Sequence, residues 1–123
     1  MTQSKILLID NEPLTTQPLR ACLESTGRFK VREENDSLKA SAAALEFRPD
    51  LILLDVDMPK KDGGTVAAEL RANPAFKKTP IIFLTGIITE DDIERTGSTI
   101  NGFPFIAKPV VLAELIKTVE KYL

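Results

Sequence analysis

The 123-residue sequence predicts an α/β domain in which strands and helices alternate five times and form an open, doubly wound parallel sheet. Two observations indicate this fold. The apolar runs 6–9, 51–54 and 81–84 are short, rich in Ile and Leu and flanked by polar or turn residues, which is typical of strands buried on both faces of a parallel sheet. Segments with apolar residues at helical spacing lie between them, separated by Gly and Pro.

Two further segments are predicted to be the edge strands of this sheet. Residues 29–32 alternate apolar with basic side chains, as a half-exposed edge strand does. Residues 103–107 contain Pro104, which cannot donate a ladder hydrogen bond and therefore also favours an edge. The prediction is thus a sheet of five strands.

The spacing of apolar residues predicts one helix strongly and two others more weakly. The clearest pattern closes the chain and consists of Leu112, Leu115, Ile116, Val119 and Leu123. Weaker patterns, at Leu38, Ala42 and Leu45 and at Val66 and Leu70, predict two more helices.

The first helix is predicted to begin irregularly. Pro13 suits an opening turn, whereas Pro18 should kink the helix or delay its start. Cys22 falls in the apolar pattern of this helix and is expected to be a small buried residue. Residues 89–92, with Thr89 as cap and acids behind it, predict the start of another helix.

Composition limits the function classes. With 43% hydrophobic residues, the chain is expected to form a single domain over residues 1–123. A net charge of -2 argues against a direct nucleic-acid partner, and the apolar runs are too short to span a membrane, so we expect a cytoplasmic protein. The chain has no histidine, which excludes Ser-His catalysis and imidazole metal ligands, and one cysteine, which excludes an internal disulfide.

Polar side chains follow four of the predicted strands. In chain order these are Asp10 and Asn11, Asp55 and Asp57, Thr85, and Lys108. Each alone is most simply explained as a turn former, a helix cap or a solvated side chain. The carboxyl ends of parallel strands meet at one edge, however, so together they predict a polar site there.

The chemistry of these side chains suits phosphoryl transfer. Asp10, Asp55 and Asp57 brought together would repel, by roughly 4 kcal/mol for a pair at about 4 Å and a dielectric near 20, so positive charge must compensate. Lys108 supplies one charge, and Mg²⁺ (or Mn²⁺) is the cation that such oxygen ligands favour. Asp55 would be the nucleophile, and Thr85 would hold a phosphoryl oxygen.

The segments that carry these residues resemble the signature segments of response-regulator receiver domains, the CheY-like family of two-component signalling. They read LLIDNEP, LILLDVDMPKKDGG, PIIFLTG and FIAKP, and with the closing helix they cover nearly the whole chain. The resemblance implies a flavodoxin-like (βα)5 fold with strand order 2-1-3-4-5, a signalling domain rather than an enzyme.

The resemblance also implies a site. Asp55 would accept a phosphoryl group from a phosphohistidine of a sensor histidine kinase or histidine phosphotransfer protein. Asp10 and Asn11 would form the acidic pocket, and the main-chain carbonyl of Asp57 would be a further metal ligand. The aspartyl phosphate would then act on a downstream output domain or protein, with the domain a monomer or a phosphorylation-dependent dimer.

The resemblance also implies a conformational switch near the ends of the fourth and fifth strands. Thr85 and Lys108 would contact the phosphoryl group, with a cis peptide bond before Pro109. The shift of Thr85 would let Phe105 move and would repack the face made by the fourth helix, the fifth strand and the last helix. One departure is Phe105, where the family often has a Tyr or another aromatic. Phe has no hydroxyl to form a hydrogen bond, so switching would depend on packing alone. Plain core packing is an equally good interpretation of Phe105.

Asn11 is the other departure, because the family usually has a second acid there. An amide oxygen carries no charge, so we expect weaker Mg²⁺ binding. Two other interpretations remain open. One is a receiver-like interaction domain that is not phosphorylated, and the other is a small phosphatase of haloacid-dehalogenase type, which shares the motif Asp55-Val56-Asp57.

Overall fold

The computed structural model describes residues 3–86, 99–100 and 102–123, and its secondary structure alternates as predicted. The strands are β1 (Ser4–Ile9), β2 (Phe29–Glu34), β3 (Leu51–Asp55), β4 (Ile81–Thr85), β5 (Thr99–Ile100) and β6 (Phe103–Ala107). The α-helices are α1 (Pro13–Ser25), α2 (Ala40–Phe47), α3 (Gly63–Ala72) and α5 (Leu112–Tyr122), with 3₁₀ turns η1 (Ser37–Lys39) and η2 (Pro74–Phe76).

The strands form one sheet in the order β2-β1-β3-β4-β6-β5. The first five are parallel, which confirms the predicted order of the five principal strands. β5 is a two-residue strand that pairs antiparallel with β6. The prediction of 103–107 as an edge was therefore incomplete, since β5 covers its outer side. Two residues are too few to show a strand period in the sequence.

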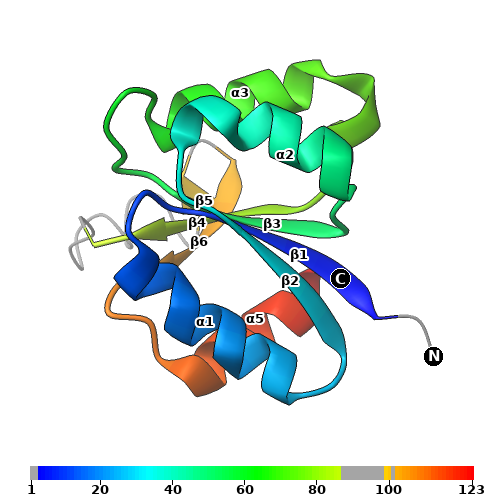
Figure 1. Cartoon of the computed structure of the whole chain (residues 1–123), viewed down its shortest axis with the longest axis vertical. Coiled ribbons are helices and arrows are strands. Elements are labelled where there is room, and N and C mark those ends of the chain that lie inside the picture. Colours follow the sequence, from blue (N-terminus) through cyan, green and yellow to red (C-terminus); the bar gives the residue numbers. More distant parts are fainter. Residues whose placement is uncertain (1–2, 87–98, 101) are drawn as a thin grey trace.

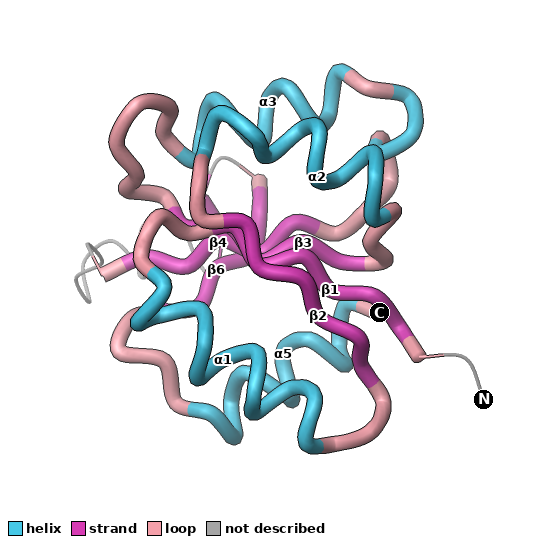
Figure 2. Tube along the Cα trace, viewed as in Figure 1, coloured by secondary structure: helices cyan, strands magenta, loops and turns pink. Residues whose placement is uncertain are grey.

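Helices cover both faces of the sheet (Figure 1). α2 and α3 lie on one face, and α1 and α5 lie on the other, with the strands between them in Figure 2. Successive residues of a strand point to opposite faces, so Leu7 and Ile9 join the core under α2 and α3 while Ile6 and Leu8 join the core with α1 and α5. This burial on both faces confirms the interpretation of the short apolar runs.

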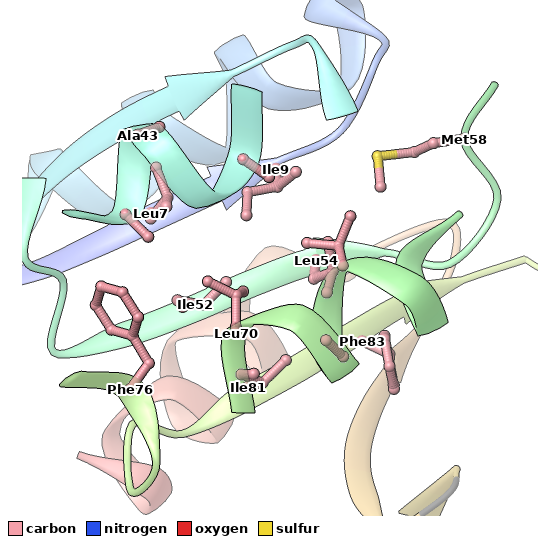
Figure 3. Packing of buried hydrophobic residues seen from close by; sticks show 14 residues of the cluster. Leu7, Ile9, Ala43, Ile52, Leu54, Met58, Leu70, Phe76, Ile81 and Phe83 are labelled. Carbon is pink, nitrogen blue, oxygen red and sulfur yellow. The ribbon is translucent and has the colours of Figure 1, made fainter. Parts of the chain in front are cut away.

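The core under α2 and α3 is closely packed (Figure 3). Ala43 of α2 and Leu70 of α3 lie against side chains from the central strands, among them Leu7, Ile52 and Ile81. Val66 and Leu70 are buried, as their spacing predicted. Both layers of the core end at the edge of the sheet where the polar residues follow β1 and β3.

The predicted face of α2 was wrong. Leu38 and Leu45 are 56% and 43% exposed, and the buried side chains are Ala40, Ala43 and Ala44. A 3₁₀ turn over residues 37–39 precedes the helix, so Leu38 is not part of it. Small alanine side chains allow α2 to lie close to the sheet, and the leucines therefore face outward.

The first helix is more regular than predicted. It begins at Pro13, which occupies its first turn, and continues through Pro18, so Pro18 does not delay its start. Cys22 is partly exposed and not buried, because Leu19 and Leu23 take the buried positions of this helix. Of the last helix, Leu115 and Val119 are buried as predicted.

Two expectations concern other parts of the chain. The predicted helix start at residues 89–92, and with it the fourth helix, lies outside the described residues. Within the described ranges, no helix combines the length and apolar character needed to cross a membrane.

Gly63 allows α3 to begin directly against the end of β3. A Cβ at this position would lie 2.8 Å from the Val56 Cα and closer still to the Asp55 carbonyl oxygen. We expect Gly63→Ala to lower the free energy of unfolding by about 1–3 kcal/mol, as overpacking does. Urea denaturation measures this change.

Gly64→Ala is the matched control, because a Cβ there would meet only Asp62 Oδ1, at 3.5 Å. In a helix this change stabilises by roughly 0.5–1 kcal/mol. Equal stability of the two variants would show that the close approach at Gly63 does not constrain the fold.

Candidate functional site

The predicted polar residues meet at one edge of the sheet. β1, β3, β4 and β6 run parallel and are in register at their carboxyl ends, with Ile9 beside Leu54, and Asp55 beside Leu84. Asp10 follows β1, and Lys108 follows β6. The strands alone therefore carry both residues to the end of β3, where Asp55 lies.

Lys108 joins two buried carboxylates. Its Nζ lies 2.8 Å from Asp55 Oδ1 and 3.3 Å from Asp10 Oδ2. Asp10 and Asp55 are only 1% and 3% exposed. The Lys108 main-chain N–H donates to the Thr85 carbonyl oxygen at 2.8 Å, and the Lys108-Pro109 peptide bond is cis, as the resemblance implied. The structure thus brings Asp10, Asp55 and Lys108 into direct contact.

The Asp10 carboxylate is held from a second side. Its Oδ1 accepts the main-chain N–H of Glu12 at 3.0 Å, while its Oδ2 faces Lys108. Its own main-chain N–H donates to the Glu34 carbonyl oxygen at 3.1 Å, one residue beyond the β1–β2 ladder. Both oxygens of this buried carboxylate therefore have donors, as burial of a charge requires.

Burial raises the pKa of the Asp55 carboxyl above its ordinary value. The Lys108 hydrogen bond opposes this rise, and the negative charge of Asp10 adds to it. Burial lowers the pKa of the Lys108 ammonium, but its bond to Asp55 and the charge of Asp10 outweigh that effect and raise it overall. The site therefore holds a full ammonium beside a carboxylate that is costly to ionise, and additional positive charge would favour its ionised form.

Thr85 and Phe105 lie on adjacent strands. Thr85 is the last residue of β4 and is buried, and the register places Phe83 beside Phe105 and Thr85 beside Ala107. Residues two apart on a strand share a face, so Thr85 and Phe83 are on the same side of the sheet as Phe105. Phe105 is partly buried against the core under α2 and α3.

Asn11 and Asp57 have open surroundings. Both are exposed at the edge where Asp10 and Asp55 are buried. Within the described residues no three His, Cys, Asp or Glu side chains come together as metal ligands, so the expected convergence of three carboxylates was wrong. Two carboxylates meet, and the Asp57 main-chain N–H hydrogen-bonds the Asp55 carboxylate.

The donor set fits a hard divalent cation that keeps part of its water shell. Mg²⁺ binds proteins through one or two carboxylates plus waters and neutral oxygens. Asp10 and Asp55 supply the carboxylates, and Asn11 and Asp57, which follow them closely in the chain, are exposed residues with an amide oxygen and a main-chain carbonyl to offer. These four residues would hold the ion.

Three residues of the site environment could not be found from the sequence. Gly63 allows α3 to approach Asp55, and Asn35 and Thr16 form hydrogen bonds around Asp10. One feature of the sequence points to Asn35, because it follows an edge strand at the same end of the sheet as the site. That strand was expected to end at residue 32, however, whereas β2 extends to Glu34.

Comparison with known proteins identifies the family. The family model of the response regulator receiver domain matches residues 6–120. The chain belongs to this family. It is therefore a receiver domain of two-component signalling, a signalling module and not a classical enzyme.

Curated relatives agree with this assignment. The receiver domain is 32% identical over 120 residues to the DNA-binding dual master transcriptional regulator RpaA of Synechocystis, covering 97% of this chain but only 48% of RpaA. It is 32% identical to the polar-differentiation response regulator DivK of Brucella anthropi, covering 100% of this chain and 98% of DivK. The chain thus spans about half of one relative and nearly all of the other.

Solved structures show the same fold. The chemotaxis protein CheY4 of Vibrio cholerae has a TM-score of 0.86 at 27% identity, with 99% of this chain and 100% of that one covered. The receiver domain of a sensor histidine kinase from Pseudomonas aeruginosa has a TM-score of 0.82 at 30% identity, with 98% of each chain covered. That protein is described with a magnesium ion in its active-site cleft.

The raised pKa of Asp55 has a consequence for stability. Because the folded state binds this proton more tightly than the unfolded state, the free energy of unfolding falls as pH rises from the ordinary carboxyl range through the raised pKa. Asp55→Asn removes the ionisation, so we expect it to stabilise the receiver domain at pH ~7 and to give a smaller gain below pH ~4. Urea denaturation in chelator at both pH values tests this, and a variant less stable than wild type at neutral pH would contradict it.

Proposed function

We propose that this receiver domain accepts a phosphoryl group on Asp55 and that Mg²⁺ supports the transfer. The observation that carries the proposal is the contact of Lys108 Nζ with two buried carboxylates, Asp55 and Asp10, which come from separate strands. Burying two like charges is costly, and clusters of this kind are typical of functional sites.

The proposed step is an in-line displacement. An Asp55 carboxylate oxygen attacks the phosphorus of a phosphohistidine, the P–N bond breaks, and the imidazole leaves with the bonding electron pair. The chain has no histidine, so the donor belongs to another protein. Lys108 is already within hydrogen-bond distance of Asp55, and its ammonium can remain beside the new phosphoryl oxygens. Mg²⁺, when bound, would neutralise the charge of the transferred group.

An apolar surface beside the site supports docking of such a donor. A groove of about 380 Å³ is lined by Thr15, Pro18, Leu19, Lys108, Pro109, Val110 and Leu112. Leu14 and Val111 adjoin residues of this groove in the sequence, and they are 79% and 61% exposed. Exposed apolar side chains that lie next to an apolar groove indicate a contact surface. A helical histidine-bearing partner resting there would place its imidazole near Asp55.

Output would pass through β6 and α5. Phosphorylation draws Thr85 toward the new oxygens, and Phe105, which shares its face of the sheet, repacks in response. A groove of about 310 Å³ between β6 and α5 is lined in part by Phe105, Glu114 and Thr118. A change at Phe105 therefore alters a surface that a downstream partner can contact.

One observation favours a second function. Asn11 lacks the charge that would complete an acid pair with Asp10, and an exposed amide binds Mg²⁺ less strongly than a carboxylate. A receiver-like interaction domain that is never phosphorylated is therefore the alternative.

Phosphorylation can be tested with acetyl phosphate and Mg²⁺. We expect intact mass spectrometry to show one phosphoryl adduct on the wild type and none on Asp55→Asn. Asp50→Asn is the matched control, because Asp50 precedes the same strand at its opposite end and should keep the adduct. Absence of an adduct from the wild type would favour the interaction domain, and an adduct on Asp55→Asn would move the acceptor elsewhere.

Asn11→Asp tests the metal site separately. An added unit charge about 4 Å from a divalent ion is worth about 2 kcal/mol in water, so we expect the Mg²⁺ dissociation constant to fall roughly thirtyfold. Isothermal titration of both proteins measures the change. Equal affinities would show that position 11 does not face the ion.

A further inference from the structure

We propose that Asn35 is a positioning residue for the cation pocket, because its side chain fixes the main chain at Asp10. The inference rests on the proposed function, since it concerns how the pocket for Mg²⁺ is held. Asn35 directly follows β2 and has no place among the residues that contact Asp55 or Lys108.

Asn35 extends the sheet by one residue. The parallel ladder between β1 and β2 ends at Ile9 and Glu34, and the Asp10 N–H still donates to the Glu34 carbonyl oxygen. One step further the main chain of β2 no longer pairs, and the Asn35 side chain takes over. Its Nδ2 donates to the Asp10 carbonyl oxygen at 2.7 Å. Both peptide groups of Asp10 are thereby tied to the same neighbouring segment.

The orientation of the Asn35 amide is determined by its other partner. Nδ2 also donates to Thr16 Oγ1 at 3.1 Å, and the Thr16 hydroxyl donates its own proton to Glu33 Oε1 at 2.5 Å. The hydroxyl oxygen can therefore only accept from Asn35, which must present its NH₂ group. Both hydrogens of Nδ2 are then used, so the amide cannot rotate without losing a bond.

This arrangement is anchored on the first helix. Thr16 is fully buried in α1, and Glu33 is paired with Arg20 of the same helix at 3.4 Å. Asn35 thus links the end of β2, the end of β1 and the first turns of α1. The segment it fixes carries Asp10 and Asn11, which are the proposed ligands from this side of the site.

Positioning matters more here than in a site with two acids. Asn11 contributes no charge, so Asp10 must supply the electrostatic attraction of this loop, and its placement sets how well the pair with Asp55 fits an ion. A merely structural role for Asn35 predicts lower stability alone, whereas a positioning role predicts weaker Mg²⁺ binding by folded protein.

The experiment measures Mg²⁺ binding to the unphosphorylated receiver domain by isothermal titration. Asn35→Leu keeps the approximate shape and removes both donors, and we expect the Mg²⁺ dissociation constant to rise about three- to tenfold, as loss of one supporting hydrogen bond does. At saturating Mg²⁺ the rate of phosphorylation by acetyl phosphate should return toward that of the wild type, because the reacting groups are unchanged.

Asn73→Leu is the matched control. The Asn73 side chain accepts the Ala75 N–H at 2.9 Å before β4, away from the site, so its loss should lower stability and leave Mg²⁺ affinity unchanged. Thr16→Val and Thr16→Ser form a second pair, in which Val should weaken Mg²⁺ binding and Ser, which keeps the hydroxyl, should restore it. If Asn35→Leu does not fold, this pair tests whether the Asn35 hydrogen bonds position the Mg²⁺ pocket.

The outcomes separate this inference from the proposed function. Wild-type protein that binds no Mg²⁺ would overturn both. Wild-type protein that binds Mg²⁺, with Asn35→Leu or the Thr16→Val variant binding equally well and only melting earlier, would overturn the positioning role and leave the proposed function standing.

Discussion

The ammonium of Lys108 between two buried carboxylates is the interaction on which the rest of the site depends. Without it, Asp10 and Asp55 would repel each other in surroundings that exclude most water. Lys108 offsets one of the two charges and leaves a net negative site. That imbalance is the electrostatic basis for the proposed Mg²⁺ at this edge of the sheet, since a divalent cation would offset the remaining negative charge.

The sheet brings these groups together through its geometry. Parallel strands end at one edge, and each of four strands ends in, or is followed by, one polar group of the site, while both faces are covered by helices. Gly63 adds a local requirement, since α3 begins against the main chain of Asp55 and leaves no room for a side chain. Core packing and site geometry are therefore linked at the end of β3, where Leu54 belongs to the core and Asp55 to the site.

The features particular to this chain lie around that common frame. Asn11 carries no charge and Phe105 no hydroxyl. Asn35, which directly follows β2, adds a bond to the main chain of Asp10. Under the proposed function, these three residues would adjust the affinity for Mg²⁺ and the transmission of the signal, whereas Asp55 and Lys108 would keep their roles.

Sequence by itself determined the five principal strands, their parallel order and the meeting of Asp10, Asp55 and Lys108. The strands follow from runs of apolar residues, and the meeting of the three side chains follows from the rule that parallel strands end together. The order of the strands was implied only by the resemblance to receiver domains. The sequence-based prediction was wrong where close packing determines which face of a helix is buried. Leu38 and Leu45 have helical spacing, yet the alanines of α2 face the sheet because they permit a closer approach.

Tertiary structure alone decided the finer arrangement. That Asp57 stays exposed while Asp10 is buried, that Asn35 reaches the main chain of Asp10, and that β5 covers β6 all depend on contacts between segments far apart in the sequence. A hydrogen bond across 25 residues leaves no periodicity in the chain, since it depends on where two loops lie once the core has formed.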